Sequence, residues 1–186
     1  MEGVPSVIEA EASRTGDFPS LESKTLAEAI ARDDAATVRT LLANKPPPAV
    51  VDRAGNNLLA YAVHTLAERK DAGLGTLRTL LEAGARPRES RMGDGSSMIR
   101  TLLLSAYRCP QATEAVLLLL QHGADPNEKD SSTGNPILYS AGDNTAIVQA
   151  LVEHGADIDA PGEYGLDRKS TRLNSSHVAL SRMPSS

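Results

Sequence analysis

Residues that could carry out acid–base or metal chemistry are scattered along the chain. The four histidines, His64, His122, His154 and His177, lack the spacing of a metal site. The sequence contains no glycine-rich phosphate loop and no Gly-x-Ser-x-Gly nucleophile motif. We therefore predict no catalytic residue, no metal ligand and no cofactor, and we expect that the chain is not an enzyme.

The single cysteine, Cys109, excludes an internal disulfide. A cysteine nucleophile is the alternative, but no histidine stands in a Cys-His arrangement with it, so Cys109 is interpreted as a packing residue at the start of a helix. The net charge is −5 and no cluster of basic residues occurs in the body of the chain, which argues against nucleic-acid binding. The N-terminus has no signal-peptide pattern, and the longest apolar run, 115–120, is too short for a membrane span. We expect an intracellular, cytoplasmic chain that binds no membrane.

His122 and His154 each stand just before Gly-Ala in a repeated segment, and Asp125 and Asp157 also fall at matching positions of it. The two aspartates are therefore not an acid–base pair. An apolar helical run ending at Gly-Ala-Asp occurs at 116–125 and again at 148–157, and related copies lie at 77–85 and 38–45. The first leucine of each Leu-Leu pair, or its counterpart, recurs at intervals of 39, 39 and 32 residues. These leucine positions are Leu41, Leu80, Leu119 and Leu151. A period of this length predicts a stack of helical units, with the largely apolar helix around Val116 at its centre.

The repeat resembles the ankyrin family, whose Thr-Pro-Leu-His-x-Ala motif opens the first helix of each unit. The closest copy is Asn135-Pro136-Ile137-Leu138, and no copy keeps the histidine that ties neighbouring loops in the family. The leucine position of the motif is filled by Leu26, Leu59, Met98 and Ile137. Relative to the first unit, the second and third have six more residues between their helices and the fourth has one fewer. The resemblance implies an all-α, ankyrin-type helix-turn-helix solenoid with hairpin loops, with about four repeats and the start of a fifth.

The predicted organisation follows from these positions. Lys45 stands where the other copies have the helix-ending glycine, and the triproline 46–48 is interpreted as a stiff connector, with a polyproline ligand as the alternative. We predict a disordered lead-in at 1–23 and a repeat domain at 24–166. Its repeats are placed at about 24–50, 51–88, 89–127 and 128–160, with a partial fifth at 161–166.

The helical pattern ends after residue 166. Segment 167–177 resembles the translation of a widely used short-read sequencing adapter, and 181–186 resembles its continuation in the same frame. We therefore interpret 167–186 as a non-native, disordered tail, without which the net charge falls from −5 to −8. We expect the native chain to continue beyond Leu166, because the last helix pair would otherwise lack a neighbour or polar cap over its apolar residues. These are Ile147, Val148, Leu151 and Val152.

Resemblance to the ankyrin family implies a monomeric protein–protein interaction module, a scaffold or adaptor that binds its partner on a concave face of hairpin tips and first helices. The predicted contact residues are Arg53, Asn56, His64, Arg91, Met92, Lys129, Asp130 and Glu163. Two alternatives remain at this point. The repeats could be the targeting region of a larger enzyme or channel, or a structural spacer without a partner.

Overall fold

Helices in consecutive pairs make up the chain in the computed structural model, which describes residues 16–43, 45–69, 73–142 and 144–162. Within these residues there are eight α-helices, one 3₁₀ turn and no β-strand. The first helices of the pairs are α2 (Leu21–Ala31), α4 (Leu58–Glu68), α6 (Met98–Ser105) and α8 (Ile137–Ser140). The second helices are α3 (Ala35–Leu42), α5 (Gly75–Glu82), α7 (Ala112–Gln121) and α9 (Thr145–Glu153). The prediction of an all-α chain is confirmed for the described part.

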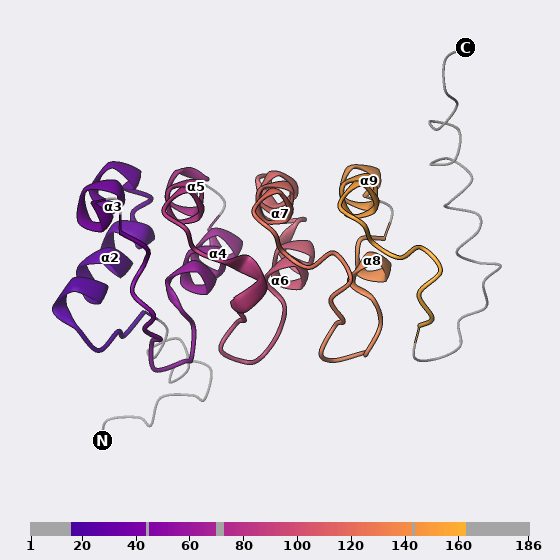
Figure 1. Cartoon of the computed structure of the whole chain (residues 1–186), viewed down its shortest axis with the longest axis horizontal. Helices are drawn as coiled ribbons and strands as arrows, with labels where there is room; N and C mark the ends of the chain where they lie inside the picture. Colours follow the sequence, from indigo (N-terminus) through magenta and orange to yellow (C-terminus); the bar gives the residue numbers. More distant parts are fainter. Residues whose placement is uncertain (1–15, 44, 70–72, 143, 163–186) are drawn as a thin grey trace, which may run out of the picture.

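The pairs stand side by side in two rows. Figure 1 shows α3, α5, α7 and α9 in one row and α2, α4, α6 and α8 in the other. Each helix packs against the corresponding helix of the next pair, as α2 does on α4 and α5 on α7. The loops that lead into α4, α6 and α8 project beyond the row of first helices, all at the same edge (Figure 1). This arrangement brings loops that are far apart in sequence next to one another.

Polar residues start most of the helices. Asp34, Asn57, Ser97 and Asn144 each occupy an N-cap position and accept a hydrogen bond from a backbone amide three residues later. Such a cap satisfies one of the donors that a helix leaves unpaired in its first turn. Helix α5 has no cap of its own, and Asp33 of the preceding pair accepts from both the amide and the hydroxyl of Thr76 instead.

Three second helices end in the same way, as the sequence predicts. Gly84, Gly123 and Gly155 all have a φ near +90°, which a residue without a Cβ adopts at little cost. In each case the following alanine amide donates to the carbonyl five residues before it, as Ala85 does to Leu80.

Lys45 is not the stop position of the first unit. Helix α3 ends at Leu42, and Ala43 takes the left-handed conformation with φ 42°. The prediction that placed the stop at Lys45 is therefore wrong by two residues, because a chain without glycine there turns at the small Ala43 instead.

The core lies between the two rows of helices. Helix α7 is buried along most of its length, and Ala115, Val116 and Leu119 are fully buried. It packs against α5, α6 and α9, which confirms the predicted central position of this helix. Cys109, just before α7, is also buried, in agreement with a packing role. Of the four apolar residues that were expected to lack cover in the last pair, Ile147 and Leu151 are fully buried and Val148 and Val152 are half-buried.

Residues 16–23 fold onto the stack, in contrast to the prediction that they belong to a disordered lead-in. Helix α2 begins at Leu21 and is capped by Ser20, whose hydroxyl accepts from the Ser23 amide. The Phe18 side chain is fully buried and meets the Tyr61 ring edge-on, with centroids 5.7 Å apart. The burial of this one phenylalanine explains why the segment at 16–23 folds onto the stack. Residues 1–15, in the same predicted lead-in, lie outside the described residues, as does the tail.

Candidate functional site

Three loops form the edge that Figure 1 shows beyond the first helices, and we call them the hairpin loops: 51–57, 91–97 and 129–136. Each loop is closed by a backbone hydrogen bond across its base. The amides of Asp52, Met92 and Asp130 donate to carbonyls four or five residues later. These three residues occupy the same position in their loops, and all three are buried. The side chain at the base of each loop is therefore buried, whether it is a carboxylate or a methionine.

The joint between the first two hairpin loops consists of uncharged groups. The Asn56 amide oxygen accepts from the backbone amide of Gly93 at 2.8 Å, and its nitrogen donates to the Asp52 carboxylate within its own loop. The Asn57 side-chain amide donates to the Ser90 hydroxyl at 2.8 Å. The backbones also approach closely, since a Cβ built on Gly93 would lie 1.8 Å from the Ala54 carbonyl oxygen. Only glycine fits at this point of the joint.

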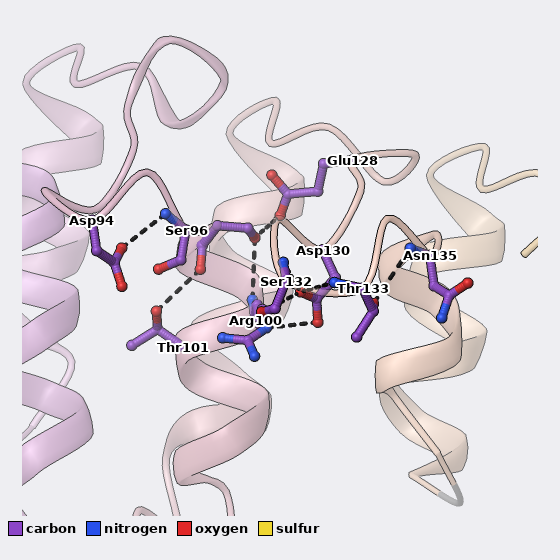
Figure 2. A network of polar contacts seen from close by, with 10 residues as sticks. Asp94, Ser96, Arg100, Thr101, Glu128, Asp130, Ser132, Thr133 and Asn135 are labelled. Atoms are coloured by element: carbon purple, nitrogen blue, oxygen red, sulfur yellow. Dashed lines mark hydrogen bonds and ion pairs between the residues drawn. The ribbon is translucent and has the colours of Figure 1, made fainter. Parts of the chain in front are cut away.

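The joint between the second and third hairpin loops consists of two ion pairs, and Figure 2 shows the one between Arg100 and Asp130. One oxygen of Glu128 accepts from the Arg91 guanidinium at 2.6 Å, and the other accepts from the Ser97 hydroxyl. Arg100, on α6, donates to the Asp130 carboxylate at 2.6 Å. The Glu128 and Asp130 side chains are only 8% and 6% exposed, so both pairs are largely shielded from water on their acidic side.

The pKa values of the two carboxylates in this joint are shifted in opposite directions. Burial raises the pKa of Glu128, and the hydrogen bonds from Ser97 and Arg91 offset only part of that effect. Burial also acts to raise the pKa of Asp130, but hydrogen bonds from Arg100 and from the amide and hydroxyl of Ser132 outweigh it. They lower the pKa of Asp130 to about 2.

The structure separates the predicted contact residues into accessible and enclosed ones. Arg53 and Lys129 are exposed on their loops, and Arg53 also pairs with Asp17 at 2.9 Å. Arg91 is about half exposed but is held by Glu128. His64 is half-buried on α4.

Asn56, Met92 and Asp130 are buried, and their predicted role as contact residues is corrected to a structural one. Two of them make the loop joints and the third fills the base of its loop. Glu163 lies outside the described residues.

A row of partly exposed side chains on the first helices was missed. Tyr61, Arg100 and Tyr139 each stand two residues after the leucine position of the motif, and each is half-buried. They come from α4, α6 and α8, which are neighbours in one row. The constant offset in the sequence could have identified this row. The Arg100 pairing with Asp130 had no such signal, because the partners are 30 residues apart.

Comparison with known proteins gives one distant relative. No family model matches the chain. Over 128 residues the chain is 31% identical to the B-cell lymphoma 3 protein homolog of Mus musculus, an ankyrin-repeat protein. The aligned part covers 66% of this chain and 26% of that relative, so the chain spans about a quarter of its length. No helix in the described residues has the length and apolar character needed to cross a bilayer.

Proposed function

We propose that this chain is an ankyrin-type repeat domain that binds another protein through its hairpin loops and the adjoining faces of its first helices. The observation that carries the proposal is the shared edge, where loops from three successive units lie side by side. A stack of this kind offers an extended surface made of many short contributions, which suits a protein partner better than a small molecule. The likeness to an ankyrin-repeat relative supports the same function.

The accessible side chains define the surface that we propose. Arg53 and Asp94 stand within the first and second loops, and Lys129 is exposed at the base of the third, where it pairs with Pro136. The Asp94 carboxylate accepts from the Ser96 amide and keeps a lowered pKa, because its hydrogen bonds outweigh the opposing effect of burial. The row of Tyr61, Arg100 and Tyr139 lines the first helices beside the loops. A partner would therefore meet aromatic edges flanked by charges of both signs.

A non-enzymatic role fits the chemistry on this surface. Among the described residues, no group of three or more His, Cys, Asp or Glu side chains is placed to hold a metal ion. Two carboxylates beside the third loop, Glu128 and Asp130, are held by arginines within the joint. Their geometry serves the packing of one loop on the next. The targeting region of a larger enzyme or channel stays the alternative, and it would use the same surface.

The experiment compares two exposed cations of the hairpin loops with an exposed arginine on the other row of helices. Partners are captured from a cell extract with the wild-type chain, with Arg53→Ala/Lys129→Ala, and with Arg39→Ala on α3. Quantitative mass spectrometry then measures each captured protein. We expect specific partners that are lost at least in part with the double variant and kept with Arg39→Ala. Partners that respond to Arg39→Ala alone would place the binding surface on the second helices. Capture of no specific partner would favour the structural-spacer alternative.

A further inference from the structure

A second exposed patch lies at the opposite end of α6 from its hairpin loop. Helix α6 starts at Met98, next to the loop, and ends at Ser105, where a turn leads toward α7. Leu104 is 56% exposed and Tyr107 is 80% exposed at this end. The Arg108 guanidinium lies over the Tyr107 ring, 5.2 Å from its centroid. We call Leu104, Tyr107 and Arg108 the turn patch.

The repeat does not require apolar side chains here. The second unit has the same spacing as the third, so Thr65 and Glu68 occupy the positions that match Leu104 and Tyr107. Both of those residues are polar. Leaving a leucine and a tyrosine in water loses the free energy that their burial would provide, about 25 cal/mol per Å². The exposed pair is therefore a property of the third unit alone.

Arg108 differs from the other arginines in the described part of the chain. Eight of them pair with a carboxylate, as Arg78 does with Glu114 and Arg88 with Asp125. Arg69 donates to the Ala31 carbonyl. Arg108 contacts the Tyr107 ring and no carboxylate among the described residues. A guanidinium stacked on an aromatic ring keeps its outer N–H groups directed to solvent, where they can bind a carboxylate in bidentate fashion.

We propose that the turn patch is a separate docking site for an acidic peptide segment that carries a large apolar side chain next to an aspartate or glutamate. The apolar side chain covers Leu104 and one face of Tyr107. The neighbouring carboxylate pairs with Arg108, an arginine that has no acidic partner among the described residues. Tyrosine and arginine are both enriched among the residues that carry most of the binding energy at protein interfaces. This site does not depend on the hairpin loops, so it goes beyond the function proposed above.

The test uses a phage-displayed library of random twelve-residue peptides, selected on the full chain and depleted on the Leu104→Ser/Arg108→Gln variant. We expect the enriched peptides to share an apolar residue beside an acidic one. A fluorescein-labelled copy of an enriched peptide should bind at least tenfold more weakly to Leu104→Ser and to Arg108→Gln. Leu21→Ser and Arg32→Gln are the matched controls, because they remove an exposed leucine and an exposed arginine elsewhere, and they should leave the affinity unchanged.

Three results would overturn the proposal. Selection could return no peptide that depends on the patch, or peptides without an acidic residue. Binding could persist unchanged in Arg108→Gln. Sedimentation equilibrium could show that the patch joins two copies of this chain, which would make the occupant a second copy instead. Thermal melting of each variant checks that it is folded, and no change is expected because the substituted side chains are exposed.

Discussion

The two joints between neighbouring hairpin loops are held together by different chemistry. In the first joint, the Asn56 side chain accepts from the Gly93 amide, and the backbones touch where only glycine fits. In the second joint, Arg91 and Arg100 pair with Glu128 and Asp130 across the loops. The first joint depends on close contact and uncharged hydrogen bonds. The second depends on charges that are mostly withdrawn from water.

This difference shows that the two joints do not depend on one recurring residue. Different polar residues connect the loops in each pair of units. The hydrogen bonds of the first joint do not recur in the second. Uncharged hydrogen bonds respond little to pH or salt, whereas the contribution of a buried ion pair changes when either partner titrates, and removal of one partner is costly. We therefore expect sensitivity to pH to be concentrated in the second joint.

The largest effect is expected from Gly93→Ala, which should break the first joint. Its methyl group would meet the Ala54 carbonyl oxygen and force the loops apart, at a cost of roughly 3–5 kcal/mol in the free energy of unfolding. Urea unfolding measures this cost. Gly95→Ala is the control, because no atom lies within 4 Å of its Cβ and only the positive φ is penalised, by about 1 kcal/mol. Similar costs for the two variants would show that the close contact is not essential.

Leu119→Ala should lower the stability of the helix core in the unit that takes part in both joints. This fully buried side chain lies in the middle of α7, and its truncation should cost about 2–5 kcal/mol. Because the effect acts on the shared core, it should be independent of pH between 3 and 7, unlike the effects of changes in the second joint. Urea unfolding at several pH values tests both statements. A loss below about 0.5 kcal/mol would contradict the central role of this helix.

Arg91→Ala should selectively weaken the second joint. It leaves the Glu128 carboxylate with only the Ser97 hydroxyl, and we expect a loss of about 1–3 kcal/mol. The same substitution in a Glu128→Gln background should cost less, since no buried charge is then left unpaired. Arg53→Ala, at an exposed pair in the first loop, is the control and should change stability by less than about 0.5 kcal/mol. Equal losses for Arg91→Ala in both backgrounds would argue against the ion pair.

The smallest effect is the pH dependence of the second joint. The folded pKa of Asp130, about 2, is below its ordinary value of 3.8, so its stabilisation is present above pH 4 and is lost as the pH falls toward 2. The stability difference between wild type and Asp130→Asn should therefore shrink over that range, by about 1 kcal/mol given that Arg100 is 23% exposed.

Glu128 should behave in the opposite way. Because its folded pKa lies above 4.5, its favourable contribution is present below that pH and is lost as the pH rises through the folded value. Relative to Glu128→Gln, wild type should gain stability on acidification toward pH 4.5. Asn57→Ala, in the first joint, removes hydrogen bonds to uncharged groups only and should cost the same at every pH between 4 and 7. A pH-dependent cost for Asn57→Ala would remove the distinction between the joints.

The helices and the core could be predicted from the sequence because their causes are local. Gly84, Gly123 and Gly155 stop their helices through their own backbone freedom, and Asn57 and Ser97 cap through atoms three residues away. The leucine spacing identified the buried faces, including that of α7. The prediction that the first unit's second helix stops at Lys45 was wrong, because Ala43 takes the left-handed conformation instead. The predicted lead-in was also wrong at Phe18, whose partner Tyr61 is 43 residues away in the sequence.

Which loop residues are exposed and which are buried was decided only by the tertiary structure. Arg53, Asn56, Lys129 and Asp130 are all polar residues in predicted turns, and nothing in their types separates exposed from buried. Asn56 and Asp130 are enclosed because Gly93 and Arg100, 37 and 30 residues away, are brought against them when the units stack. The sequence determines where each helix begins, ends and buries its apolar face, since these depend on neighbours a few residues apart. Which polar side chain remains for a partner depends on contacts between units, and those exist only once the stack has formed.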